Sequence, residues 1–323
     1  MSLRRLQRLR RTKVIRDMLS DVGFSMEHLI QPIFAVEGIS QAEPILGLKD
    51  NYRLPVNQVL AQIESDYERG VRNFLLFPVP AKKMERNFSG KFAADLIKKV
   101  KDKFTDQISI WVDICLCSYN VDGHCCIYDQ NGVHNLSASL QELANLAKEY
   151  ALSGADGVAP SDMNDGRTAV IRQTLDEVGR DCAAIMSYSA KFASNFYGPF
   201  RNACDSPPRF GDRKQYQIDV RSRRDALASS LRCYNEGADL LMVKPAMSSI
   251  DLIAPIKESS GAACGAYQVS GEFASLTLLS DNGLVDFQAA LKETLLVLRR
   301  AGANFIITYG ARHAAEIGLA PSF

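Results

Sequence analysis

The sequence predicts an α/β fold, a (β/α)8 TIM barrel preceded by an extended N-terminal arm. Three observations lead to this prediction. The chain holds eight short apolar runs, polar segments with helical spacing lie between them, and its 323 residues match the length of one α/β barrel. We expect residues 1–28 to form the arm and residues 29–323 to form the barrel.

The predicted strands are the apolar runs, which fit parallel strands because such strands are buried on both faces. They cover residues 29–36, 73–79, 109–116, 157–161, 183–189, 239–245, 264–271 and 304–310. The segments between them, such as residues 139–157, place apolar residues at helical spacing and stop at a Gly-Ala-Asp sequence. Strand and helix therefore alternate, and eight such units close into a barrel. A doubly wound open sheet is the alternative, but it normally carries a Gly-rich loop after its first strand, which residues 34–44 lack.

Composition indicates an ordinary soluble chain with 46% hydrophobic and 23% charged residues. It has no apolar run of the roughly 18 residues that a membrane span needs, and no signal-peptide pattern. We therefore predict a cytoplasmic or organelle-matrix protein without a membrane partner. The net charge of +1 argues against a nucleic-acid partner.

Residues 4–13, "RRLQRLRRTK", are the one strongly basic segment. They could bind RNA or an anionic surface. A solvated or subunit-embracing extension is favoured, because the rest of the chain shows no interleaving of basic and aromatic residues.

Polar and reactive residues gather where the predicted strands end, which in a barrel is the rim that carries chemistry. They are Asp113, Cys115, Cys117, Ser161, Asp162, Lys191, Lys244, Ser270, Glu272 and Tyr309. Lys191 and Lys244 follow adjacent strands. A buried lysine beside another cation loses proton affinity, and its neutral amine can attack a carbonyl to form a Schiff base. The alternative is that each lysine pairs with a rim carboxylate such as Asp113 or Asp162.

The segment 192–217 is long for a loop after a barrel strand, which indicates a lid or a binding loop. Its Arg201 and Arg213 could clamp a substrate carboxylate. Two lysines with these arginines between them favour imine chemistry on an anionic carbonyl substrate. A surface loop with solvated arginines is the alternative.

Cys115, Cys117 and Cys125 form a C-x-C-x7-C pattern. If residues 113–117 are extended, Cys115 and Cys117 share one face with Asp113. Three thiolates suit zinc, and a three-ligand site leaves a position open for water or substrate, as in a catalytic site. Buried free thiols are one alternative. A closed structural site, completed by Cys126 or His124, is another.

Four further segments match one family: "VAPSDMNDGR", "IMSYSAKFASNFYGPFR", "MVKPA" and "YQVSGE". With the cysteine segment, they make the chain resemble the porphobilinogen synthase family, also called 5-aminolevulinate dehydratase, over nearly its whole length. The resemblance implies a lyase of tetrapyrrole biosynthesis that condenses two 5-aminolevulinate molecules into porphobilinogen with loss of two waters. It also implies a homo-octamer in which the arm wraps a neighbouring barrel.

The resemblance assigns roles to individual residues. Lys244 and Lys191 would form the two Schiff bases, and Cys115, Cys117 and Cys125 would bind zinc. The substrate-binding residues would be Ser270, Tyr309, Arg201, Arg213, Gln217, Tyr197, Asp113, Ser161 and Asp162.

The chain departs from the family pattern at several positions. Asp122 stands where His is common and Cys126 where Gly is common, so a fourth thiol lies near the proposed zinc ligands. The loop 80–92 lacks the usual motif. Ala228 and Ser229 stand where many bacterial relatives place a carboxylate for an allosteric magnesium. We therefore predict that magnesium does not activate this protein.

Two other functions remain open at this stage. Another Schiff-base barrel lyase or aldolase would explain one lysine, but it leaves the second lysine and the cysteines without a role. A non-catalytic zinc- or RNA-binding protein would use the basic arm.

Overall fold

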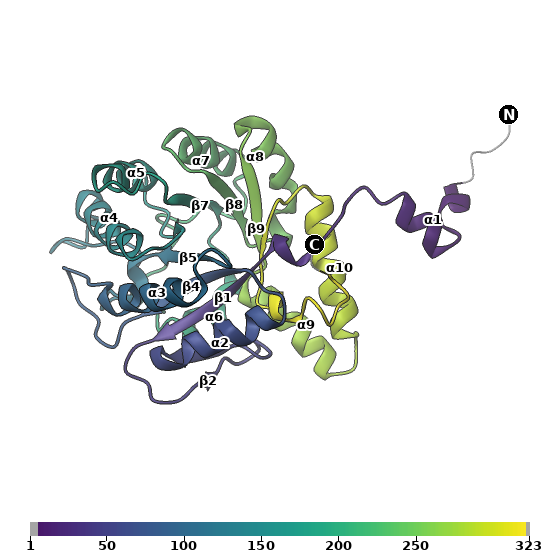
Figure 1. Cartoon of the computed structure of the whole chain (residues 1–323). Helices are drawn as coiled ribbons and strands as arrows, with labels where there is room; N and C mark the ends of the chain where they lie inside the picture. Colours follow the sequence, from purple (N-terminus) through teal and green to yellow (C-terminus); the bar gives the residue numbers. More distant parts are fainter. Residues whose placement is uncertain (1–5, 321–323) are drawn as a thin grey trace.

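The computed structural model describes residues 6–320 and contains the barrel that the sequence predicts (Figure 1). Its strands are β1 (Leu29–Val36), β4 (Asn73–Val79), β5 (Ser109–Ile114), β6 (Gly157–Pro160), β7 (Ala184–Lys191), β8 (Leu240–Lys244), β9 (Ala263–Tyr267) and β10 (Ile306–Ile307). Neighbouring strands pair in parallel in chain order, and Leu29 of β1 lies opposite Ile306 of β10. This last pairing closes the eight-stranded barrel.

Helices surround the barrel and cover the outer face of its strands (Figure 1). They are α2 (Val56–Glu68), α3 (Lys91–Phe104), α4 (Leu136–Leu152), α5 (Arg167–Glu177), α7 (Arg223–Asn235), α8 (Ile253–Ser260), α9 (Ser270–Asp281) and α10 (Phe287–Arg300). The short helix α6 (Gly198–Ala203) lies instead near the end of β8, where the Phe200 ring is 4.9 Å from the Lys244 amine. In α3, for example, Ala93, Ile97, Val100 and Phe104 recur at helical spacing and are buried, whereas Lys91, Lys98, Lys99 and Lys103 are exposed. Short 3-10 helices lie at Leu6–Arg10, Met26–His28, Leu116–Ser118, Asn195–Tyr197, Met247–Leu252 and Ala311–His313.

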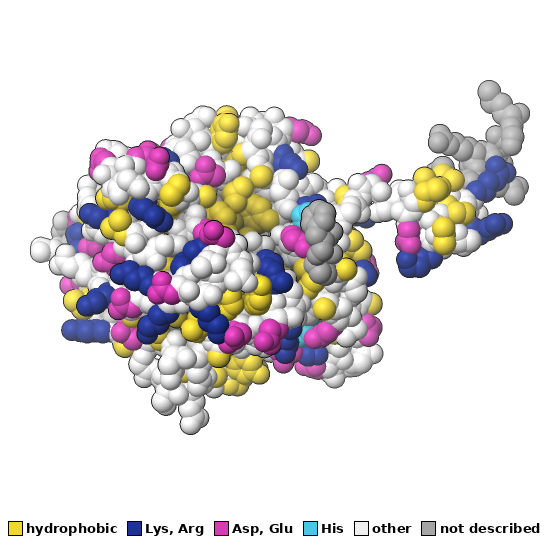
Figure 2. Space-filling model, viewed as in Figure 1, with side chains coloured by type: hydrophobic (Ala, Val, Ile, Leu, Met, Phe, Trp, Pro, Cys, Tyr) yellow, Lys and Arg dark blue, Asp and Glu magenta, His cyan; other side chains and the backbone are white. Residues whose placement is uncertain are grey.

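The N-terminal segment stands away from the barrel (Figures 1 and 2). It contains the 3-10 helix Leu6–Arg10 and α1 (Lys13–Met18), and no residue of α1 is buried. Val14 and Met18 are 77% and 74% exposed although both are apolar. Residues 4 and 5 of the predicted basic segment lie outside the described residues. Within the described part of the chain, no helix is long and apolar enough to cross a membrane.

The structure differs from the sequence prediction in three local features. A hairpin of β2 (Glu43–Pro44) and β3 (Tyr52–Pro55) follows β1 and was not predicted. The seventh strand ends at Tyr267, and Ser270 begins α9, because the Glu272 carboxylate accepts a hydrogen bond from Val269 N at 2.7 Å and caps the new helix. The assumption that residues 113–117 are extended is wrong, since a 3-10 helix begins at Leu116.

The loop 80–92, whose sequence departs from the family pattern, is held at both ends. Met84 N donates to Tyr119 O at 2.9 Å, and Val121 N donates to Met84 O at 3.1 Å. The buried Glu142 carboxylate accepts from Asn87 N and Phe88 N, so α4 fixes the second half of this loop.

Candidate active site

Lys191 and Lys244 lie side by side at the C-terminal ends of β7 and β8, where they are register partners. Lys191 is 5% exposed and Lys244 is 3% exposed. The Lys191 ammonium donates to the Ser161 carbonyl, at the end of the neighbouring strand β6. The parallel barrel thus brings both amines to one buried place, as the sequence predicted for adjacent strand ends.

Four aromatic rings surround the Lys244 amine. Its Nζ lies 3.9 Å from the ring centroid of Tyr267, 4.9 Å from those of Tyr188 and Phe200, and 5.4 Å from that of Tyr197. Ring faces attract a cation, but they accept hydrogen bonds poorly compared with a carboxylate. Lys244 therefore sits in an apolar cage.

Burial lowers the pKa of Lys244 well below its ordinary value, and the positive charge of Lys191 lowers it further. The negative charge of Asp113 opposes this shift. The carboxyl of Asp113 is itself affected, because burial raises its pKa to about 7 in spite of the two lysines. The site thus combines a weakly basic amine with a carboxyl that changes its protonation near neutral pH.

The two rim carboxylates named in the ion-pair alternative have other partners. Asp113 Oδ2 accepts a hydrogen bond from Ser161 Oγ at 3.1 Å. Asp162 Oδ2 lies 3.6 Å from Nε of the buried Arg167, and its Oδ1 accepts from Asn164 N at 2.7 Å. Asp162 therefore pairs with Arg167 and Asn164 and stabilises the segment after β6.

Cys115, Cys117 and Cys125 converge although their local backbone differs from the expected one. Their sulfur atoms lie within 4.8 Å of one another and are buried. Hydrogen bonds from the Cys115 and Cys125 thiols lower the pKa of Cys117 well below its ordinary value, and the charge of Arg213 contributes. Three close thiols, one of them favoured as a thiolate, form a donor set that fits zinc.

Cys126 and His124, the two residues considered as a fourth metal ligand, do not join the cluster of three cysteines. Cys126 is buried outside the cysteine cluster, and burial raises the pKa of its thiol to about 12. His124 directs both ring nitrogens at Tyr216 and Phe210, which belong to the segment after β7. The position opposite the three thiols is therefore not filled by either side chain.

The segment 192–217, which we call the lid, contains α6, and its Tyr216 packs against the three cysteines. Arg213 is buried and donates to Gly123 O at 2.8 Å and to Ser206 O at 2.5 Å. Nε of Arg201, Nε of Arg213 and both amide atoms of Gln217 are buried without a hydrogen-bond partner in the described part of the chain. Three of these four atoms are N–H donors, so this part of the lid is suited to bind an anionic group.

Ser270, Tyr309 and Tyr197 lie close to the rings around Lys244 or belong to them. Ser270 Oγ accepts from Phe200 N at 3.1 Å, and the hydroxyls of Tyr309 and Tyr267 are 3.0 Å apart. Tyr197 directs its hydroxyl to Phe192 O at 2.7 Å and to Lys244 O at 3.3 Å, so its ring rather than its hydroxyl faces the Lys244 amine.

Sequence reasoning missed Tyr188, Phe200 and Tyr267, three of the four rings of the cage. Tyr188 Oη is buried without a partner in the described residues, as is Asp113 Oδ1. Tyr188 precedes Lys191 by three positions, so regular alternation would place the two on opposite faces of β7. The register of β7 shifts between Ser187 and Ala190, which brings both side chains to the interior. The sequence carries no clear signal for this bulge.

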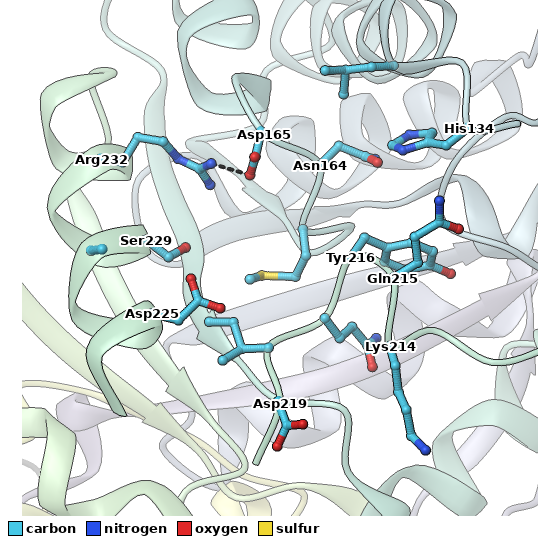
Figure 3. A pocket seen from close by; sticks show the side chains of 15 residues that line it. His134, Asn164, Asp165, Lys214, Gln215, Tyr216, Asp219, Asp225, Ser229 and Arg232 are labelled. Carbon is cyan, nitrogen blue, oxygen red and sulfur yellow. Dashed lines mark hydrogen bonds and ion pairs between the residues drawn. The ribbon is translucent and has the colours of Figure 1, made fainter. Parts of the chain in front are cut away.

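A cavity of about 530 Å³ lies outside the lysine site, between the end of the lid, α7 and the segment after β6 (Figure 3). Neither lysine lines it. Arg232 from α7 pairs there with Asp165, and its Nε lies 3.4 Å from Glu236 Oε1. The guanidinium of Arg232 therefore places a positive charge at the edge of the cavity.

Three comparisons with known proteins agree with one another. The family profile described as delta-aminolevulinic acid dehydratase matches residues 3–317. The chain is 39% identical over 316 residues to the delta-aminolevulinic acid dehydratase of Archaeoglobus fulgidus, with 97% of each chain covered. It is 38% identical to that of Halalkalibacterium halodurans over 323 residues, covering 98% of this chain and 97% of the relative.

A solved structure is similar over the same extent. The delta-aminolevulinic acid dehydratase (porphobilinogen synthase) of Toxoplasma gondii, in complex with the reaction product porphobilinogen, superposes with a TM-score of 0.91 at 33% identity. The match covers 98% of this chain and 91% of that chain.

Proposed function

The chain belongs to the delta-aminolevulinic acid dehydratase family of lyases, and we propose that it condenses two 5-aminolevulinate molecules into porphobilinogen with release of two waters. The observation that carries this proposal is the pair of buried lysines, Lys191 and Lys244, at adjacent strand ends. A reaction that joins two carbonyl substrates needs an amine for each, held where the substrates meet.

In the proposed reaction, each lysine attacks the ketone carbon of one substrate. The amine adds to the carbonyl, the oxygen leaves as water, and a protonated Schiff base remains that withdraws electrons from the neighbouring carbon. Asp113, whose pKa is about 7, lies near both lysines and is suited to move protons at neutral pH. The carbon next to one Schiff base, after losing a proton, attacks the Schiff-base carbon of the other substrate and forms the C–C bond. The lysine on the attacked carbon then leaves as a free amine by elimination, and the amine of one substrate displaces the other lysine, so both lysines are regenerated.

The two substrate carboxylates would be held by different groups. Ser270 and Tyr309 would bind the carboxylate of the substrate on Lys244. Arg201, Arg213 and Gln217 of the lid would bind the other, and their unpaired buried donors support this role. Tyr197, Ser161 and Asp162 would line or brace the pocket.

Cys115, Cys117 and Cys125 would hold a catalytic zinc ion. When bound there, zinc would polarise a substrate oxygen or activate water. The nearby Arg213 would tie the metal site to the lid, since its guanidinium influences Cys117 and donates to Gly123 O.

We further propose that magnesium does not activate this enzyme. The cavity in Figure 3 is lined by Ala228 and Ser229, the positions where the family pattern leads us to expect a magnesium-binding carboxylate. The Asp165 carboxylate there is already paired with Arg232. Among the described residues, the only group of three clustered metal-ligand side chains is the cysteine cluster.

The arm is proposed to serve assembly into a homo-octamer. Its exposed Val14 and Met18 have no partner surface in the isolated chain, and burying them against a neighbouring barrel would be favourable.

The deciding experiment is to incubate the purified protein with 5-aminolevulinate, reduce it with borohydride and map the modified lysines by mass spectrometry. We expect Lys244 to be modified, Lys191 under at least some conditions, and porphobilinogen to form without reductant. Modification of a single lysine without porphobilinogen formation would instead favour another Schiff-base lyase or aldolase. Modification of neither lysine in metal-loaded protein would refute the proposal.

A further inference from the structure

The loop that carries the metal-ligand candidates is joined to the lid by hydrogen bonds to its backbone carbonyls. Arg209 N of the lid donates to Asp122 O at 2.9 Å. Arg213 Nη2 donates to Gly123 O at 2.8 Å. These contacts follow each other along both segments, so residues 122–125 and the lid run alongside one another.

His124 lies at the centre of this junction and is fully buried. Its Nε2 is 2.9 Å from Phe210 O, and since a carbonyl only accepts, Nε2 carries the proton. In the neutral ring, Nδ1 is then the acceptor, and Tyr216 O–H donates to it at 3.1 Å. The same Tyr216 oxygen accepts from Cys125 N at 3.2 Å. One lid hydroxyl is therefore shared by His124 and by the cysteine that follows it.

Ring packing also holds residues 122–125 against the lid. The His124 ring contacts the Phe210 ring at a centroid distance of 4.5 Å, and Tyr128 packs edge-on at 5.1 Å. Gly123 has φ +72°, and a Cβ there would lie 2.4 Å from Pro207 O of the lid. Loop and lid are thus in backbone contact, and neither can shift alone without breaking the other's hydrogen bonds.

We propose that His124 is a positioning residue that couples metal loading at Cys115, Cys117 and Cys125 to closure of the lid. Metal bonds to Cys125 fix the backbone of residues 124 and 125. His124 and Tyr216 then hold the lid, and with it Arg213, over the substrate site. This inference rests on the proposed function for the identity of the metal and for the role of Arg213, but the junction itself is a property of the fold.

Limited trypsinolysis tests the coupling without any need for turnover. Arg209 and Lys214 are exposed lid residues and offer cleavage sites. We expect zinc-loaded wild-type protein to resist cleavage there, and protein stripped with a chelator to be cut about ten- to thirtyfold faster, because cleavage follows the open population. His124→Ala with zinc bound should be cut as fast as stripped wild type, since it loses two hydrogen bonds that hold the lid.

A second variant covers the case in which His124→Ala does not fold or does not bind zinc. Tyr216→Phe removes only the shared hydroxyl and should also abolish zinc-dependent protection. Its zinc content, measured by mass spectrometry or atomic absorption, should stay at the wild-type level. The matched control is Tyr128→Phe, which loses a different lid contact, to Gln215 Oε1, and should keep the protection.

The test of the coupling between metal loading and lid closure is independent of the test of the proposed function. If zinc does not alter wild-type cleavage, or if zinc still protects both His124→Ala and Tyr216→Phe, the coupling is wrong even when porphobilinogen is formed. If the lysines are not trapped but the protection follows the expected pattern, the coupling stands and the proposed reaction is wrong.

Discussion

Replacing Lys244 with methionine should abolish turnover and yet stabilise the fold. The amine is 3% exposed inside a cage of rings, and burying such a polar group costs about 1–3 kcal/mol in proteins. Methionine has a similar length and packs well against aromatic rings. The cation–π attraction between the Lys244 amine and the Tyr267 ring, 3.9 Å away, opposes this gain in stability. It acts only on the protonated fraction of the amine.

The net effect is a gain of roughly 1 kcal/mol for Lys244→Met, which raises the melting temperature of a chain of this size by about 1 to 2 °C. Thermal unfolding followed by circular dichroism measures it, alongside porphobilinogen formation. Lys257→Met is the matched control. Lys257 donates to Gly302 O at 2.8 Å on the surface of α8, so its loss should cost about 1 kcal/mol.

The sign of the pH dependence provides a second check on Lys244→Met. Burial, with Lys191, lowers the pKa of Lys244 in the folded state, so the unfolded chain binds more protons between the folded and the ordinary value. Wild-type stability therefore rises with pH across that interval, and the advantage of Lys244→Met grows as pH falls. Destabilisation of Lys244→Met by more than about 2 kcal/mol would refute the reasoning, because it would mark Lys244 as a well-paired structural cation.

Four further outcomes are expected. Cys117→Ser should lower zinc content and activity together; full activity in its metal-free form would remove zinc from the mechanism. Tyr309→Phe should raise KM about tenfold or more with a smaller effect on kcat, because a hydrogen bond to a charged group contributes about 1.5–3 kcal/mol, and an unchanged KM would exclude Tyr309 from substrate binding. In wild type, kcat/KM should fall as pH drops through about 7, where Asp113 of the free enzyme takes up a proton, and Asp113→Asn should be nearly inactive at every pH; a normal rate in that variant would contradict the role of Asp113. Titrating magnesium into zinc-loaded enzyme should leave the rate unchanged, and a clear increase would show that the Arg232–Asp165 pair does not replace that ion.

The architecture could be predicted from sequence because every barrel strand lies within a short, mostly apolar run. Once the strands are placed in order, a parallel barrel brings all their C-terminal ends to one rim, so the proximity of Lys191 and Lys244 follows from topology alone. Family membership, inferred from the same motifs, is confirmed by the match over residues 3–317. The roles of individual residues stay predictions.

Local backbone geometry was less predictable than topology. Cys115 and Cys117 were expected to meet because an extended segment places alternate side chains on one face. They do meet, with sulfur atoms 3.3 Å apart, but through a turn of 3-10 helix that begins at Leu116. Ser270 was placed at a strand end, whereas it begins α9, where Glu272 caps the helix. Side-chain capping can decide such boundaries, and apolar runs do not reveal it.

The bulge in β7 explains why the rings around Lys244 could not be predicted from the sequence. In a strand with regular alternation, either Tyr188 or Lys191 would face outward, into the layer of helices. The extra residue between Ser187 and Ala190 turns both inward, so the Tyr188 ring lies 5.5 Å from Lys191 Nζ and 4.9 Å from Lys244 Nζ. One ring therefore forms a wall of both amine sites and helps to keep water from them. Because desolvation is the largest cause of the lowered pKa of Lys244, an irregularity of one residue in the sheet contributes directly to the basicity of the proposed nucleophile.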